Sequence, residues 1–394
     1  MTNTMKENSN YDIIDVIIEN VTKEWEESMK NNSINKEKWE VPKYSKSEIN
    51  KAGKIISNPE SSKEDRDNAL VILNNWRASH AYPLQVICTN LRRKNPNAIV
   101  VQRLKRLESI TGKIERFPEM QLYKMQDLGG CRVIVETIDQ VYEAVRKYKK
   151  SYIKHIFKKE NDYIKNPKES GYRSYHMVYK FYSDKKETYN NNMLIEIQFR
   201  TKLQHIWATA VEMMGIYTKS NLKASQGDKE ILRFFTIVSS IFAIQENMPT
   251  CPNTPRFMED LIPEMKELNE KHKILDILSA LKVSIDYTTK LNFKNKNLYY
   301  LLILDYIKGK VQIRSFPTSK VEFATKVYDN IEKSSTKDVV LVSATSFDTL
   351  KFAYPNYFVD ISDFIDTLQS IITGYENALK EDKLIEQQIL KRNS

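Results

Sequence analysis

Two acidic residues, Asp127 and Glu196, have sequence neighbours that would place their carboxylates where a divalent metal ion could bind. Asp127 stands just before a β-type run at 130–136, beside two glycines that allow close backbone approach. The run 193–200 alternates apolar and polar residues, so Glu196 and Gln198 share one side of a predicted strand. Mg²⁺ is usually held by one or two carboxylates together with substrate phosphates, and Glu196 could also take a proton from an attacking hydroxyl. The alternatives are an ordinary turn at Asp127 and a strand with a solvent-exposed face at Glu196.

Basic residues dominate the segment 97–117, which we predict to be one long helix that ends before Pro118. A triphosphate carries several negative charges, and arginine contacts it through paired hydrogen bonds. The segment is therefore a candidate phosphate site, with a merely solvated helix face as the alternative. The cations of this segment and of the following strand are Arg103, Lys105, Arg106, Lys113, Arg116 and Arg132.

An aromatic residue follows a lysine-rich segment, 151–171, that we predict to be an exposed loop. Tyr172 comes directly after a glycine at the junction between this loop and the next predicted strand, where its ring could stack on a nucleotide base. His176 lies on the same side of that strand. The alternative for Tyr172 is a ring packed in the core, and we interpret His205 as a packing or surface residue.

The composition suits a polyanionic partner without requiring one. The chain has 394 residues, with 61 Lys and Arg against 51 Asp and Glu, so its net charge is +10. Its three cysteines are far apart, which indicates neither a disulfide framework nor a zinc site. No signal peptide is visible, and the apolar run 298–307 is too short to span a bilayer, so we expect a cytoplasmic protein with no membrane contact.

The order of predicted elements indicates an α+β fold with a mixed β-sheet, flanked by helices. Helices are expected at 11–30, 46–60, 63–80, 138–149, 203–217, 229–246, within 257–291 and at 361–392, and strands at 130–136, 172–182, 193–200, 298–304, 311–313 and 339–342. We predict three parts. A first domain spans 1–225, a helix and linker span 226–256, and a C-terminal region spans 257–394 with a smaller β-containing module at about 297–360.

Five blocks of these residues, in order, resemble the synthetase domain of RelA/SpoT homologues over about residues 70–220. They are Arg103-x-Lys105-x₃-Ser109-Ile110-x₂-Lys113, Asp127-Leu-x₂-x-Arg132, Asp162-Tyr-Ile-x₂-Pro-Lys168-x₂-Gly-Tyr172-x-Ser-x-His176, Glu196-Ile-Gln198-x-Arg200-Thr and Trp207-Ala-x₃-Glu212. The resemblance implies a nucleotidyltransferase-like domain that transfers the β,γ-pyrophosphate of ATP to a ribose hydroxyl. No His-Asp dipeptide occurs, so the hydrolase activity of the family is not expected.

The resemblance also implies a role for each block. Asp127 and Glu196 would hold Mg²⁺, and together with Tyr172 they would be the catalytic residues. The ATP-binding residues would be Arg103, Lys105, Ser109, Lys113 and Arg132. The acceptor nucleotide would be bound by Lys168, Tyr172, His176 and Gln198, with its base stacked on Tyr172.

The residues themselves do not identify the acceptor molecule. The resemblance points to the toxic small alarmone synthetase branch of the family. That branch implies transfer to the 3′ CCA end of tRNA, which would block translation; the alternative is an alarmone synthetase that makes (p)ppGpp or (pp)pApp. The segment 74–83 resembles these toxins. The residues that would contact the tRNA backbone are Arg77, Arg92, Arg93, Lys94 and the loop 149–168. A catalytically silent nucleotide-sensing or RNA-binding protein is the remaining alternative.

The C-terminal half resembles the antitoxin region of fused CapRel-type toxin–antitoxin proteins. Tyr354 and Tyr357 form a Tyr-x-x-Tyr motif that, by this resemblance, would block the ATP site. Packing is the alternative for two tyrosines in a chain that has 22 of them. The resemblance implies a self-inhibited phage-defence protein that a phage protein, such as capsid, releases by binding the C-terminal region. The module lacks the Cys and His set of a zinc site, so no zinc is expected.

Overall fold

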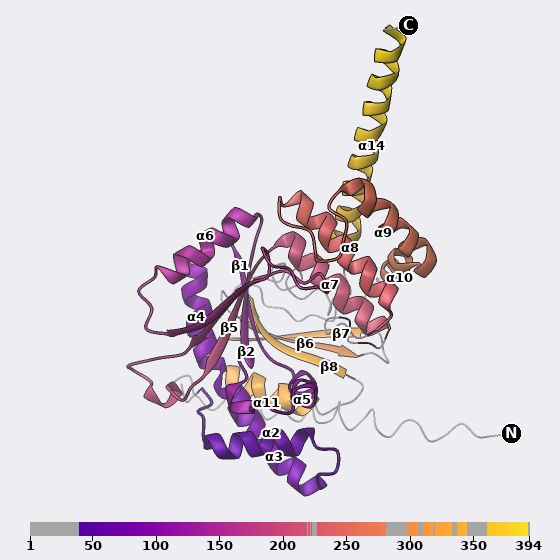
Figure 1. Cartoon of the computed structure of the whole chain (residues 1–394). Coiled ribbons are helices and arrows are strands. Elements are labelled where there is room, and N and C mark those ends of the chain that lie inside the picture. The colour runs from indigo at the N-terminus through magenta and orange to yellow at the C-terminus, as the bar shows by residue number, and fades with distance from the viewer. Residues whose placement is uncertain are drawn as a thin grey trace, which may run out of the picture. The chain divides into compact units, whose positions relative to one another are not determined.

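The structure is a computed structural model of the chain. It describes residues 39–218, 220, 222, 227–280, 298–305, 310–317, 320–332, 337–344 and 361–392, all of which belong to one compact unit. The helix predicted at 11–30 and the tyrosines Tyr354 and Tyr357 lie outside the described residues. Figure 1 shows the arrangement of the elements.

Three helices precede the sheet in the described part of the chain: α2 (Lys46–Ser57), α3 (Lys63–Ser79) and α4 (Ala81–Lys94). The first begins at a capping box, in which the Ser45 side chain and Glu48 satisfy each other's backbone N–H groups. The second begins at Ser62, whose hydroxyl accepts a hydrogen bond from a backbone N–H in the first turn. The helices predicted at 46–60 and 63–80 are therefore confirmed, and α4 is a further helix that the sequence analysis did not predict.

One eight-stranded sheet contains all the strands of the described residues, in the order β3-β4-β5-β2-β1-β8-β6-β7. Strand β2 pairs with β5 in parallel, and the other pairs are antiparallel. The sheet is therefore mixed, which confirms the predicted α+β class. The strands are β1 (Ile99–Leu104), β2 (Gly129–Val135), β3 (Ile156–Asp162), β4 (Tyr175–Lys180), β5 (Leu194–Thr201), β6 (Leu298–Asp305), β7 (Lys310–Pro317) and β8 (Lys337–Ala344).

Two sequence predictions near the site are wrong. The segment 97–117 is not one helix, because the β-branched residues at 99–101 belong to β1 and the helix α5 (Leu107–Arg116) begins only after Arg106, whose backbone is extended. Arg103 therefore lies on a strand and does not share a helix face with Lys113. The segment 151–171 is not all loop, because β3 lies within it and pairs with β4.

The other helices of the described residues are α6 (Ile138–Lys149), α7 (Lys202–Tyr217), α8 (Lys229–Gln245), α9 (Met258–His272), α10 (Ile274–Ala280), α11 (Val321–Glu332) and α14 (Ser362–Arg392). Short 3₁₀ turns occur at Leu122–Lys124 and Glu187–Tyr189. Apolar side chains of α7, α8, α9, α10 and the start of α14 form one buried cluster, and these helices lie together in Figure 1. This cluster closes one side of the unit, next to the segment that carries Tyr172. The predicted helices at 138–149, 203–217, 229–246 and 361–392 are confirmed.

The C-terminal strands continue the sheet of the preceding part of the chain. Strand β8 pairs with β1, where Gln102 lies opposite Ser343 and Arg103 opposite Val342. Figure 1 shows β6, β7 and β8 beyond β1 in the same sheet. The predicted strands at 298–304, 311–313 and 339–342 are confirmed, α11 was not predicted, and the domain boundaries stay a prediction. Among the described helices, none is long and apolar enough to cross a membrane.

Candidate active site

The register of the sheet brings the predicted site residues of four strands onto one face. Gly130 on β2 lies beside Glu196 on β5 and opposite Arg103 on β1. Gln198 on β5 lies between His176 on β4 and Arg132 on β2. Because paired residues of adjacent strands point to the same side, the side chains of Arg103, Arg132, His176, Glu196 and Gln198 all lie on this face.

Asp127 is held by two lysines at the start of β2. Its carboxylate oxygens accept hydrogen bonds from Lys105 Nζ and Lys113 Nζ, each at 2.9 Å. Burial alone would raise the pKa of Asp127, but the two ammonium groups outweigh it and lower this pKa to about 2. The backbone N–H of Lys105 also donates to Leu128 O at 2.8 Å, which fixes the lysine beside the acid. Asp127 is therefore ionised at neutral pH.

Glu196 is held by a different set of partners on β4 and β5. Its carboxylate lies 3.1 Å from His176 Nδ1 and accepts a hydrogen bond from Gln198 Nε2 at 2.7 Å. On its other side, His176 Nε2 lies 2.9 Å from the Tyr172 hydroxyl. Burial opposes charge on the imidazole, but Tyr172 and Glu196 outweigh it and raise the pKa of His176 to about 9. The same hydrogen bonds lower the pKa of Glu196 against its burial, so this carboxylate is also ionised.

The two carboxylates fit a shared divalent cation. The negative charge of Asp127 opposes this lowering of the Glu196 pKa, so the two acids are close enough to repel each other. A cation between them would relieve this repulsion. The described residues contain no group of three or more His, Cys, Asp or Glu that could hold a metal. Asp127 and Glu196 would supply two hard oxygen ligands and leave positions for phosphate oxygens, as Mg²⁺ prefers.

Aromatic rings and a lysine stand on the other side of His176. The rings of Tyr163 and His176 meet edge-on with centroids 5.3 Å apart, and those of Tyr172 and His176 do so at 5.7 Å. Lys168 Nζ lies 4.6 Å from the centre of the Tyr163 ring and 5.5 Å from that of Tyr172. Sequence reasoning missed Tyr163, although it directly follows the acid that opens the third block of the resemblance.

Three arginines gather near the middle of the same face. Burial, Arg132 and Arg103 together lower the pKa of Arg200, so the three positive charges act on one another. Arg200 is 3% exposed and bonds to the ring of His205, which confirms the interpretation of His205 as a packing residue. Arginine can form paired hydrogen bonds with phosphate oxygens, so the guanidinium groups on this face suit phosphates.

Four other predicted contact residues lie on helices. Ser109 is an exposed residue of α5, one turn before Lys113. Arg92 donates to Val100 O at 3.2 and 3.3 Å, Arg93 donates to Asn90 Oδ1 at 3.1 Å, and Lys94 is half-buried at the end of α4.

Arg77 cannot contact an RNA backbone as predicted. Its side chain is 1% exposed, lies over the Tyr328 ring at 4.9 Å and hydrogen-bonds the Tyr328 hydroxyl at 3.3 Å. The prediction is wrong because this cation, which sequence alone leaves exposed, is covered by α11. Its role is to join α3 to the C-terminal part of the chain.

Comparison with known proteins gives one matching family and several relatives. Residues 102–222 match the family model described as "Region found in RelA / SpoT proteins". The chain is 31% identical over 130 residues to GTP pyrophosphokinase YjbM of Bacillus subtilis (strain 168), which covers 32% of this chain and 61% of that protein. It is 32% identical over 133 residues to GTP pyrophosphokinase YwaC of the same strain, again covering 32% and 61%. The chain thus spans about three fifths of the length of these relatives.

Solved structures of similar proteins match a comparable part. A GTP pyrophosphokinase family protein from Streptococcus pneumoniae is 26% identical with a TM-score of 0.35, over 56% of this chain and 98% of that one. The small alarmone synthetase 1 from Bacillus subtilis bound to its product pppGpp is 24% identical with a TM-score of 0.35, over 47% and 94%. The paired acids, the clustered cations and Tyr172 all lie within the residues that match the RelA/SpoT region.

Proposed function

We propose that the RelA/SpoT region at 102–222 is the catalytic part of an ATP-dependent pyrophosphokinase, which transfers the β,γ-pyrophosphate of ATP to a hydroxyl of an acceptor nucleotide. One observation carries the proposal. Ionised Asp127 and Glu196 interact on one face of the sheet, with cations on one side of them and aromatic rings on the other. This arrangement suits the transfer of a phosphate chain between two nucleotides.

The cations would bind the donor. Arg103 and Arg132 face the site from adjacent strands, and their charges would be neutralised by the triphosphate of ATP. Lys105 and Lys113, which now neutralise Asp127, would turn to the phosphates when a metal ion takes over that acid. Bound Mg²⁺, held by Asp127 and Glu196, would neutralise charge on the phosphates.

The acceptor would lie on the aromatic side. A base stacked on Tyr172 would place its ribose toward His176 and Gln198, with Lys168 near the acceptor's own phosphates. Glu196 is bonded to both His176 and Gln198, so its carboxylate can accept the proton of the attacking hydroxyl at the same place. The positioning of donor and acceptor accounts for most of the rate in this kind of transfer.

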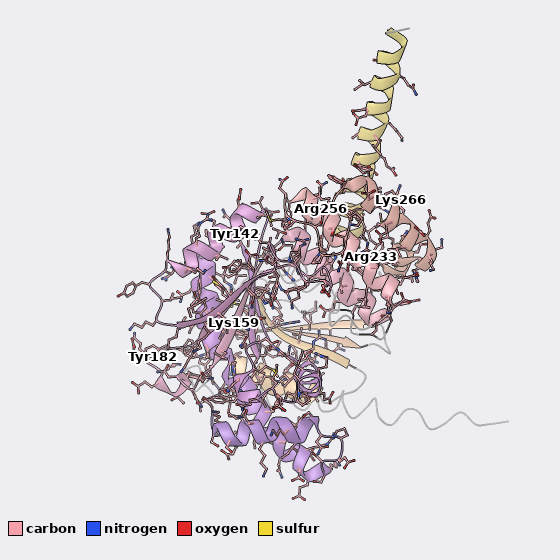
Figure 2. The ribbon with its side chains drawn as sticks, in the orientation of Figure 1. Tyr142, Lys159, Tyr182, Arg233, Arg256 and Lys266 are labelled. Atoms are coloured by element: carbon pink, nitrogen blue, oxygen red, sulfur yellow. The ribbon has the colours of Figure 1, made fainter. Side chains whose placement is uncertain are left out.

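For the identity of the acceptor, we propose the 3′ end of tRNA. Support comes from the exposed edge strand β3 and its surroundings, where Lys154, Lys158 and Lys159 lie close in sequence to exposed aromatic rings. Tyr152 is fully exposed, and Phe157 and Tyr182 are 45% and 40% exposed. Figure 2 labels Lys159 and Tyr182 in this region. Such a surface suits a nucleic-acid strand. The second candidate acceptor is a guanosine nucleotide, which is favoured by the two relatives described above, both GTP pyrophosphokinases.

A labelled-acceptor assay tests both statements. ATP carrying labelled β- and γ-phosphates is supplied with Mg²⁺ and tRNA, GDP, GTP or ATP as acceptor. We expect label on tRNA, with loss of transfer when the 3′ hydroxyl is oxidised by periodate. Label on GDP or GTP but never on tRNA would overturn the tRNA proposal, and no labelled acceptor at all, in wild type or in the Tyr354 and Tyr357 variant described next, would overturn the activity.

We also propose that the enzyme is held inactive until a phage protein, such as capsid, binds the C-terminal region, so that it acts in phage defence. The support is the resemblance of Tyr354 and Tyr357 to the inhibitory motif of fused toxin–antitoxin proteins, together with the pairing of β8 with the strand that carries Arg103. Changing both tyrosines to Ala should make the chain toxic to cells without a trigger. Normal growth of cells that accumulate the folded variant would contradict this.

A further inference from the structure

The loop that carries Tyr172 is fastened from behind by α8, which lies outside the RelA/SpoT region. Gly171 has a φ of +85°, and a Cβ at this position would lie 2.9 Å from Trp207 Cζ2 and 3.1 Å from Ser239 Cβ. Ser239 donates its hydroxyl hydrogen to Gly171 O at 2.6 Å. The loop therefore approaches α8 so closely that only glycine fits, and a buried hydrogen bond holds its carbonyl.

Arg173 makes the larger part of this attachment. Its side chain is 3% exposed. Nε donates to Ser239 Oγ at 3.1 Å, Nη1 to Ile164 O at 3.1 Å and Nη2 to Pro249 O at 2.7 Å. Nη2 also lies 3.4 Å from Cys251 Sγ. One guanidinium thus joins α8, the segment that follows it and the segment that precedes the loop.

The partners of Arg173 are themselves anchored. Arg233 on α8, labelled in Figure 2, donates Nε to Glu264 Oε1 on α9 and Nη1 to Asn253 O, both at 2.6 Å. The backbone N–H of Cys251 donates to Ser240 Oγ at 2.9 Å. Because α8 and the segment that follows it are tied to the buried helix cluster, the attachment transmits the position of that cluster to the loop.

We propose that Arg173 and Ser239 are positioning residues for the acceptor site, which makes α8 and residues 249–251 a working part of that site. They hold Gly171 in place and so keep the Tyr172 hydroxyl at 2.9 Å from His176. A platform that is ordered in advance lowers the entropy lost when the acceptor binds. The effect on acceptor binding rests on the proposed function, whereas the hydrogen bonds that hold the loop to α8 do not depend on it.

The kinetic test uses Ser239→Ala, with Ser79→Ala as the matched control. Both serines are buried, but the Ser79 hydroxyl donates to Asn75 O at 2.6 Å within α3 and makes no hydrogen bond to the loop. We expect Ser239→Ala to raise KM for the acceptor about tenfold, because it removes the buried hydrogen bond that holds the loop carbonyl. KM for ATP should stay within about twofold in both variants, and the acceptor KM should not change in Ser79→Ala. Equal changes for donor and acceptor would indicate a merely structural role and overturn the proposal.

A second measurement needs no catalytic activity. Hydrogen exchange of the ligand-free protein should show faster exchange at residues 168–174 in Ser239→Ala and in Arg173→Lys than in wild type or Ser79→Ala. Ser239→Ala removes only a hydroxyl, so it carries the test if Arg173→Lys fails to fold. Unchanged exchange in Ser239→Ala would overturn the inference. Faster exchange in a protein that labels no acceptor would support the attachment while overturning the proposed function.

Discussion

The two halves of the sheet are built from similar strands but carry different side chains. On β5, Ile195 and Ile197 are fully buried while Glu196 and Gln198 face the site. On β6, neighbouring residues that point to opposite faces, such as Leu301 and Leu302, are both 0% exposed. A strand buried on both faces has no position for a solvated charge. The comparison teaches that the candidate site residues belong to β1, β2, β4 and β5, while β8 and β6 stabilise the sheet and cover the edge that β1 would otherwise expose.

The largest effect should come from the first half. Glu196→Gln keeps the size of the side chain but removes the charge that would bind metal and accept a proton, so kcat should fall about 10³-fold. Glu143→Gln is the matched control, because Glu143 is a half-exposed residue of α6 paired with Lys147, and it should retain full activity. The label-transfer assay measures both. Activity within tenfold of wild type in Glu196→Gln would remove the basis of the mechanism.

The second half should respond in stability instead of chemistry. Leu302→Ala leaves a cavity under a fully buried side chain, so the free energy of unfolding should fall by about 3 kcal/mol. Leu379→Ala on α14 is the control, because Leu379 is 40% exposed and its loss should cost under about 0.5 kcal/mol. Urea titration measures both changes. If Leu302→Ala instead abolished activity without changing the unfolding curve, the division between the two halves would be incorrect.

A pH dependence should separate the site from the rest of the sheet in the metal-free protein. The folded pKa of Asp127 is about 2, below its usual 3.8, because Lys105 and Lys113 outweigh burial. A lowered pKa stabilises the fold above the unfolded pKa, and this contribution is lost as pH falls from about 4 to 2. Asp127→Asn should therefore destabilise the protein by about 2 kcal/mol at pH 7 and by much less near pH 2. A constant difference between wild type and variant over this range would contradict the assignment.

The smallest effect concerns the contact between the halves. The Tyr299 hydroxyl on β6 donates to Gln85 Oε1 at 3.0 Å and accepts from Gln102 Nε2 at 2.9 Å. Tyr299→Phe removes these bonds while Gln102 keeps its bond to Gln85 at 2.9 Å, so stability should fall by about 1 kcal/mol. Thermal unfolding measures the loss, and Tyr182→Phe, at a 40% exposed ring, is the control. No loss in Tyr299→Phe would indicate that the halves are joined by the strands alone.

The sequence alone was sufficient for the features that depend on near neighbours. The alternation around Glu196 predicts its strand and its face, because the two-residue period of a strand is a local property. The helices with clear caps and apolar stripes, such as α6 and α8, were predicted for the same reason. The choice of Asp127, Glu196 and Tyr172 came from motif spacing, and the structure brings these residues together.

Only the tertiary structure decided what depends on distant partners. The segment around Arg103 is a strand because β2 and β8 pair with it, although its charged residues at helical spacing favoured a helix. Arg77 is covered by Tyr328, 251 residues away, so its burial has no local signal. Arg173 and Ser239 meet across 66 residues in the same way. Pairing and burial depend on which surfaces meet after folding, and spacing along the chain does not record that.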